Sequence, residues 1–353
     1  MIFSRRKSRE GGSTAVSEPR PELAQASELA DAGDLFAAID LLNAANRAER
    51  DTALEIEIRR LRNLAGMELI DDPATEPAYV EPATEVPGLG EQSRIPEVTP
   101  AGLTAEVLRG AILANGALLV RGLMDPAKAT KLAGDIDRSF AVRSALGEGE
   151  SDPEGFYDEL EPEAPFRIAE RTWIEQGGGV LAVDSPRLLF DMLEAFENAG
   201  LRPVIEEYLG EKPAISGQKC TLRKATPDVP GAWHQDGKFM GAVRSVNVWL
   251  SLSRCGDVAP SMDVVPKRLE EFVRTGGPGT VMDNQIGQQD AEAAAEGAGI
   301  VRPIFDPGDA LIFDHLFLHQ TGSDPSMPNP RYAIESWFFG PSAYPDNYVP
   351  IAF

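Results

Sequence analysis

The sequence predicts a mainly β fold with flanking helices, in which a jelly-roll or cupin-like core follows a small α-helical hairpin. Short β-like runs separated by turns fill the C-terminal half, after a helical first part. These runs are residues 218–222, 245–252, 262–265, 299–305, 310–313 and 332–339. The chain has 353 residues, of which 42% are hydrophobic and 25% charged. Such a chain can bury a core, and its length favours one large domain with a smaller unit.

The first hundred residues divide into three segments. Residues 1–20 are polar and rich in glycine and serine, and we expect them to be disordered. Residues 21–70 have apolar side chains at helical spacing, with Asp34 as an N-cap, and predict a tetratricopeptide-like helical hairpin. One such unit cannot bury its own apolar face, so it should dock on the main domain or on a second copy. Residues 71–100 are acidic and contain six prolines, which predicts a stiff, solvated linker.

The main domain is therefore expected at residues 101–353. It should open with a helix at 104–115, a buried strand at 116–121 and a helix starting at Asp125-Pro126. Residues 147–179 are rich in acids, glycine and proline and predict a long loop or lid. A helix should follow at residues 186–209.

Composition excludes several classes of protein. Lys and Arg number 33 against 56 Asp and Glu, a net charge of −23, which disfavours binding to nucleic acid or to an anionic membrane surface. The two cysteines cannot form a disulfide framework and favour a reducing, cytoplasmic location. The basic start is not followed by an apolar segment, so no signal peptide is expected, and no apolar stretch is long enough to span a membrane.

The chain has only three histidines, and two of them have the spacing of a metal site. His234 and Asp236 would share one face of a strand, and His319 follows a second buried strand. Two imidazoles and one carboxylate leave three coordination positions open, the facial triad of non-haem Fe(II) oxygenases. His315 is the rival for His319, since positions four apart on a strand share a face. Arg331 begins the next apolar strand and could hold a carboxylate.

Residues 101–341 resemble the phytanoyl-CoA dioxygenase family of Fe(II)/2-oxoglutarate-dependent oxygenases. The resemblance is carried by Trp233-His234-Gln235-Asp236, Val248-Trp249-Leu250, Val264-Val265-Pro266, Gly308-Asp309, His319 and Arg331. It implies a double-stranded β-helix that uses Fe(II), the cosubstrate 2-oxoglutarate and O₂, and that releases succinate and CO₂.

The resemblance also implies a role for each site residue. His234, Asp236 and His319 match the iron ligands, and Arg331 matches the arginine that pairs with the distal carboxylate of 2-oxoglutarate. Thr321 matches a hydroxyl that supports the same carboxylate, and Trp249 matches a tryptophan that lines the cosubstrate pocket, although it could equally be a core aromatic. Halogenating relatives replace the carboxylate ligand, so Asp236 favours hydroxylation or a related oxidation.

Some residues depart from the family pattern. Lys267-Arg268 stands where the family often has glycine and serine, and Ala333 replaces a common serine. Residues 269–298 resemble an insertion near the mouth of the site and, with the lid at 147–179, are candidates for selecting the substrate.

We expect the substrate to be a small organic metabolite. A CoA thioester would need a basic patch, for which Arg254, Lys267 and Arg268 are the candidates. A homo-oligomer, or a protein partner bound through the N-terminal helices, stays open. Two other classes also stay open: a non-redox cupin-type metal protein, and a catalytically silent barrel that serves as a binding or scaffold protein.

Overall fold

The computed structural model describes residues 20–353, so the expected disorder of residues 1–20 falls almost entirely outside it. Its helices are α1 (Pro21–Asp31), α2 (Leu35–Ala48), α3 (Thr52–Asp71), α4 (Ala105–Asn115), α5 (Pro126–Gly147), α6 (Arg171–Gln176), α7 (Pro186–Asn198), α8 (Leu201–Leu209), α9 (Gly237–Met240) and α10 (Gln288–Ala294). Its strands are β1 (Glu97–Val98), β2 (Ala117–Val120), β3 (Gly179–Leu181), β4 (Ala214–Ala225), β5 (Ser245–Ser251), β6 (Ser261–Val264), β7 (Ala310–Phe313), β8 (His319–Gly322), β9 (Arg331–Phe339) and β10 (Pro350–Ala352).

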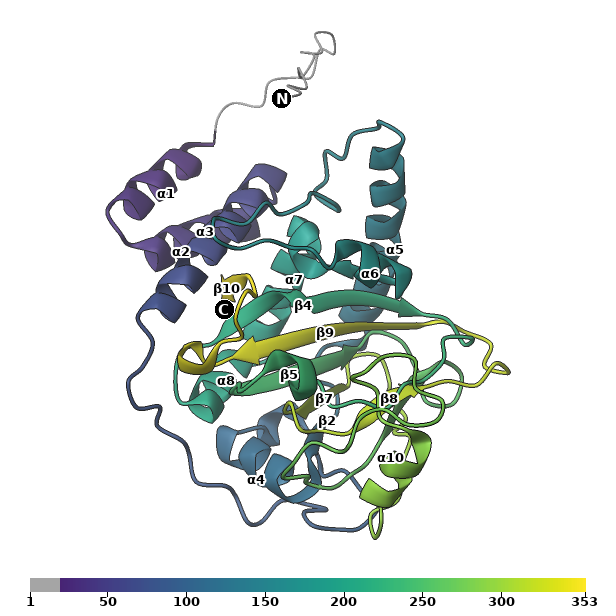
Figure 1. Ribbon diagram of the computed structural model, residues 1–353. Coiled ribbons are helices and arrows are strands. Elements are labelled where there is room, and N and C mark those ends of the chain that lie inside the picture. The colour runs from purple at the N-terminus through teal and green to yellow at the C-terminus, as the bar shows by residue number, and fades with distance from the viewer. Residues whose placement is uncertain (1–19) are drawn as a thin grey trace, which may run out of the picture.

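A mixed sheet with flanking helices forms the body of the molecule (Figure 1). The large sheet has eight strands in the order β1-β2-β7-β5-β9-β4-β10, with β3 pairing to β4, and β6 and β8 form a separate two-stranded sheet. The β1–β2 pair is parallel and the other pairs are antiparallel.

The two faces of the large sheet have different partners. Ile334, Ser336 and Phe338 of β9 point to the side on which α4, α5, α7 and α8 form the main hydrophobic core. Trp337 of β9 points to the opposite side, where a second core includes Met262 of the small sheet. Alternation along β9 therefore separates a helix-covered face from a face that turns toward the small sheet.

The N-terminal segment forms three helices, whereas the sequence predicted a two-helix hairpin. Asp34 caps α2 as expected, because its side chain accepts a hydrogen bond from the Ala37 amide. The added helix is α1, which ends before Gly33 at a φ of 84°. Their shared core includes Phe190 of α7 and Ala352 of β10, so these helices pack on the main body (Figure 1).

Residues 73–96 contain no helix, as the prolines predicted, but they do not form a freely solvated linker. Val86 and Ile95 are buried, and Ile95 belongs to the second core. The large sheet already begins at β1, a few residues before the predicted boundary at 101.

Most predicted elements of the main domain form, with two corrections. The helix expected at 186–209 is broken into α7 and α8 at Gly200, whose φ of 73° is a left-handed conformation. Residues 299–305 form no strand and make only isolated bridges through Val301 and Phe305. No described helix has both the length and the apolar character needed to cross a membrane.

Candidate metal centre

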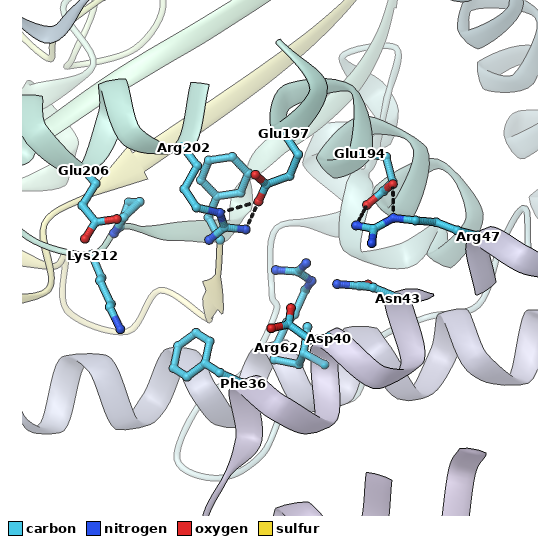
Figure 2. Close-up of a pocket in the computed structure, with 13 residues that line it drawn as sticks. Phe36, Asp40, Asn43, Arg47, Arg62, Glu194, Glu197, Arg202, Glu206 and Lys212 are labelled. Atoms are coloured by element: carbon cyan, nitrogen blue, oxygen red, sulfur yellow. Dashed lines mark hydrogen bonds and ion pairs between the residues drawn. The ribbon is translucent and has the colours of Figure 1, made fainter. Parts of the chain in front are cut away.

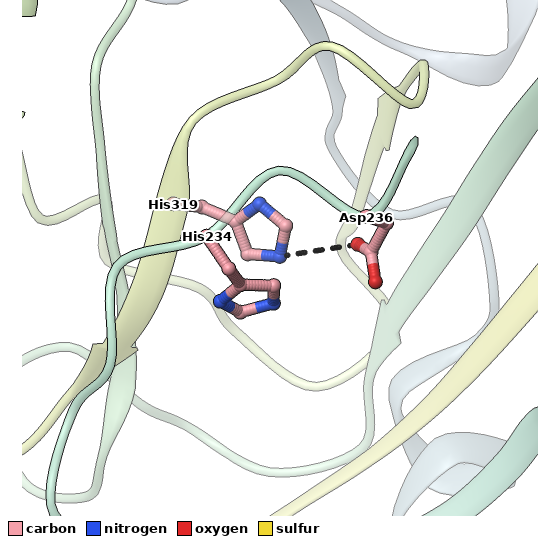
Figure 3. Close-up of side chains that lie close together, drawn as sticks. All are labelled: His234, Asp236 and His319. Carbon is pink, nitrogen blue, oxygen red and sulfur yellow. Dashed lines mark ion pairs between the residues drawn. The ribbon is translucent and has the colours of Figure 1, made fainter. Parts of the chain in front are cut away.

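His234, Asp236 and His319 converge on one point between the two sheets (Figure 3). One potential ligand atom from each residue lies within 4.8 Å of the others, and Asp236 Oδ2 is 3.6 Å from His319 Nε2. The three residues are the only His, Cys, Asp and Glu side chains in residues 20–353 that form such a group.

The backbone brings the two histidines together. The His234 amide donates to the His319 carbonyl at 3.0 Å, and the His319 amide donates back at 3.2 Å. His319 begins β8, whereas His234 lies outside any regular strand. Asp236 has helical backbone angles (φ −59°, ψ −32°) and immediately precedes α9. The expectation that His234 and Asp236 share a face of a strand is therefore wrong, because the chain turns between them.

Hydrogen bonds orient both imidazole rings. His234 Nδ1 is 2.7 Å from the Ala232 carbonyl oxygen, and His319 Nδ1 is 3.0 Å from the Phe317 carbonyl oxygen. A carbonyl oxygen only accepts, so in each ring the proton stands on Nδ1 and the lone pair is left on Nε2. This is the arrangement in which neutral histidines bind metal ions.

Burial keeps His319 neutral. It is 8% exposed, and desolvation together with the neighbouring His234 lowers its pKa to about 4, against the opposing effect of Asp236. A proton therefore competes little for Nε2 at neutral pH.

Gln235, between the two ligand candidates, fixes the loop that carries them. Its side chain is 1% exposed and donates to the Leu316 carbonyl at 2.7 Å, while its Oε1 accepts from the Val273 amide at 2.8 Å. It therefore ties the His234–Asp236 turn to the segment before His319 and to the 269–298 insertion.

His315 lies outside the cluster. Residues 314–318 form a turn, so His315 and His319 do not share a strand face as the spacing suggested. His315 Nδ1 is 3.3 Å from Ser245 Oγ, and its ring packs so closely on Gly237 that a Cβ there would lie 2.7 Å from it. Its surroundings indicate a packing role.

A cavity of about 440 Å³ contains the cluster and is lined by all six site residues that the sequence predicted. Trp249 is 2% exposed and stacks obliquely on Phe305, so it is both a core aromatic and part of the lining. Thr321 reaches the cavity from β8, two residues after His319.

Arg331 is a buried cation with few partners. It is 2% exposed, donates from Nη1 to the Ser261 carbonyl at 3.3 Å, and has no partner for Nε. Its Cζ lies 5.4 Å from the centroid of the Trp249 ring. Among the described residues no carboxylate lies within 4.0 Å of it, and burial lowers its pKa. This site is suited to a carboxylate supplied by a ligand.

The sequence analysis missed a second group of charged residues in the cavity, from β4 and β9. Lys219, Thr221 and Arg223 alternate along β4 and all line the cavity, together with Glu335 of β9. Thr221 Oγ1 donates to Glu335 at 3.0 Å. Burial raises the pKa of Glu335, but Arg223 and Arg331 outweigh this effect and hold the pKa below its usual value. Polar residues at every second position of a buried strand were the signal that could have found them.

The two candidate substrate-selecting segments differ in what they contribute. Residues 269–298 line the mouth of the cavity with Val281, Met282 and Gln285, among others. In 147–179, Phe156 and Leu160 are anchored in the main core, and only α6 reaches the cavity, through Trp173 and Ile174.

The candidate basic patch for CoA is largely neutralised. Arg254 pairs with Asp257 and Asp306, and Arg268 pairs with Asp314 at 2.5 Å. Lys267 lies 3.4 Å from the Ala294 carbonyl oxygen. Both arginines therefore already have carboxylate partners.

Comparison with known proteins finds similarity in structure only. No family model matches the chain. No curated protein matches it either. Among solved structures, EctD from S. alaskensis, crystallised with 2-oxoglutarate and 5-hydroxyectoine, has a TM-score of 0.50 at 16% identity, over 76% of this chain and 82% of that one. At this identity the likeness shows a shared fold.

Two enzymes from nogalamycin biosynthesis are similar at lower scores. The non-haem α-ketoglutarate-dependent carbocyclase SnoK has a TM-score of 0.46 at 13% identity, over 69% of this chain and 86% of its own. The non-haem α-ketoglutarate-dependent epimerase SnoN has a TM-score of 0.44 at 15% identity, over 67% of this chain and 82% of its own.

Proposed function

We propose that this protein is a non-haem Fe(II)/2-oxoglutarate-dependent oxygenase that hydroxylates, or otherwise oxidises, a C–H bond of a small organic metabolite. The strongest support is that one cavity contains both the His234, Asp236 and His319 cluster and the unpaired guanidinium of Arg331. The fold shared with EctD supports the same proposal. We further propose that the large sheet and the β6–β8 sheet form a double-stranded β-helix, as in phytanoyl-CoA dioxygenase-like proteins.

The donor set fits Fe(II). His234 and His319 offer Nε2 lone pairs, Asp236 offers a carboxylate oxygen, and three protein ligands leave room for a bidentate cosubstrate and O₂. When bound, iron and 2-oxoglutarate supply the oxidising chemistry, with release of succinate and CO₂.

The protein's own residues would bind 2-oxoglutarate and the substrate and orient them. Arg331 would hold the distal carboxylate of 2-oxoglutarate, with Thr321 supporting it and Trp249 forming the wall behind the guanidinium. Trp173, Val281 and Met282 are exposed at the cavity and would cover a small substrate and exclude water. The paired state of Arg254 and Arg268 favours such a substrate over a CoA thioester.

The three candidate ligands and Arg331 also argue against the two rival functions. A silent barrel would not need three oriented ligands and an unpaired buried arginine, and a non-redox metal protein would not need the arginine. With both cysteines reduced and buried, we propose a cytoplasmic location.

Turnover without substrate tests the proposal. In air, the purified protein with Fe(II) should convert 2-oxoglutarate slowly to succinate, and Asp236→Ala should stop this conversion. Metal-dependent activity that consumes no 2-oxoglutarate would instead support the cupin-type function.

A further inference from the structure

A second cavity, of about 420 Å³, lies between the N-terminal helices and the main body (Figure 2). Its walls come from α2 and α3 on one side and from α7 and α8 on the other, with Lys212, Pro213 and Phe353 completing it. None of its lining residues lines the metal-site cavity. It belongs to the helix-covered side of the large sheet, so it is a separate compartment.

Arg62 of α3 is a buried cation in the wall of this cavity. It is 5% exposed, and its Nη1 donates to the Ala352 carbonyl at 2.8 Å. No carboxylate of residues 20–353 lies within 4.0 Å of its guanidinium. Arg59, one turn earlier and equally buried, pairs with Asp158 at 2.5 Å. Burial within α3 therefore does not by itself explain why Arg62 lacks a carboxylate partner.

Burying an unpaired guanidinium is costly. Desolvation, with a contribution from nearby Arg202, lowers the pKa of Arg62 to about 10. In the described chain the only other buried arginine without a carboxylate partner is Arg331, which also faces a cavity of similar size. The pattern that points to a ligand carboxylate at Arg331 therefore occurs a second time.

The charges around Arg62 restrict the ligand. Arg47 is held by Glu194 through two contacts of 2.6 and 2.7 Å, and Arg202 is held by Glu197 (Figure 2). Asp40, Glu206 and Lys212 also line the cavity, and none of them makes an ion pair with a described residue. With Arg62, the cavity thus has two unpaired cations and two unpaired carboxylates, which favours a ligand that carries both a negative and a positive charge.

We propose that this cavity binds a small zwitterion, whose carboxylate pairs with Arg62 and whose ammonium group faces Asp40. Its volume lies in the range of small-molecule sites. A bound zwitterion would bridge α2 and α3 to α7 and α8 and so hold the N-terminal helices on the main body. The proposal does not depend on the oxidation chemistry of the other cavity.

Calorimetric titration of the metal-free full chain with 4-aminobutanoate, acetate, ethylammonium and inorganic phosphate tests this proposal. We expect 4-aminobutanoate to bind roughly tenfold or more tightly than acetate, because only it can use both charges. Arg331→Met should bind it equally well, which separates this site from the metal-site cavity. Absence of 4-aminobutanoate binding, or tighter binding of phosphate, would overturn the proposal.

Three variants assign the contacts. Arg62→Met should lose binding of both 4-aminobutanoate and acetate. Asp40→Asn, a change at an exposed position that leaves folding intact, should weaken 4-aminobutanoate binding and leave acetate unaffected. Asp31→Asn removes the same charge from an exposed position outside the cavity and should change neither. If Arg62→Met does not fold, an Asp40→Asn variant that binds both probes like the parent would refute the assignment.

Discussion

His234 and His319 exchange backbone hydrogen bonds of 3.0 and 3.2 Å, which places the two imidazoles side by side with a ring-centroid separation of 4.3 Å. The candidate metal site is thus built on a backbone pairing between distant parts of the chain. The side chains need little rearrangement to bind an ion, because each Nδ1 is already held by a carbonyl oxygen.

Replacing a ligand should remove iron, whereas replacing the neighbouring histidine should not. We expect His319→Ala to lower Fe(II) affinity by more than the roughly 10- to 100-fold that is typical for loss of an outer hydrogen bond to a ligand. His315→Gln is the matched control and should bind iron normally, because His315 lies outside the cluster. Anaerobic Fe(II) titration measures both variants. Equal loss of Fe(II) affinity in the two variants would contradict the assignment of His319 as the distal ligand.

Arg331→Met should act mainly on the cosubstrate. Losing a charged hydrogen-bonded pair of about 1.5–3 kcal/mol corresponds to a roughly 10- to 150-fold rise in the KM for 2-oxoglutarate, with a smaller effect on kcat. Arg254→Met removes an arginine that pairs only with surface carboxylates and should leave this KM unchanged. Steady-state succinate formation measures both. An unaltered KM in Arg331→Met would contradict the assigned role.

Gln235→Leu should loosen the turn that carries His234 and Asp236. The change leaves the partly buried Val273 amide and Leu316 carbonyl without their partner, at a cost of about 1–3 kcal/mol in the free energy of unfolding. Urea denaturation should report this loss, together with weaker Fe(II) binding. Gln289→Leu alters an exposed glutamine of α10 and should have neither effect. A Gln235→Leu protein with parental stability would show that the turn is held by other contacts.

The two cysteines should be unreactive in the folded protein. Burial raises the pKa of Cys220 to about 12 and also raises the pKa of Cys255. A raised thiol pKa means less thiolate at any given pH, so iodoacetamide at pH 8 should label neither cysteine until urea unfolds the chain. Mass spectrometry measures the labelling. Rapid modification of native protein at either position would contradict this burial.

Local patterns predicted much of the fold. The helix α4 forms where it was predicted, and β5 and β7 are buried strands as their apolar runs indicated. β8 was missed because its sequence, His-Gln-Thr-Gly, has no apolar residue, and its strand conformation depends on pairing with distant β6. Tertiary pairing of this kind leaves no periodic signal in the sequence.

Residue type and family resemblance predicted six site residues that the structure places around one cavity, but their geometry could not be predicted. The turn between His234 and Asp236 replaces the predicted strand, because Asp236 adopts a helical conformation and Gln235 is held by contacts far away in the sequence. The charged residues of β4 could have been predicted, because their alternation along a buried strand is a local signal. Their pairing with Glu335 could not, because Glu335 lies on another strand.

Anaerobic addition of 2-oxoglutarate to the Fe(II)-loaded protein tests the central claim most directly, because chelation of the keto acid to iron produces a visible charge-transfer absorption. The absorption should appear in the parent protein, saturate at one equivalent of 2-oxoglutarate, and be absent in Asp236→Ala. A protein that binds Fe(II) and 2-oxoglutarate without this absorption, or an Asp236→Ala variant that retains it, would contradict a shared iron centre at His234, Asp236 and His319.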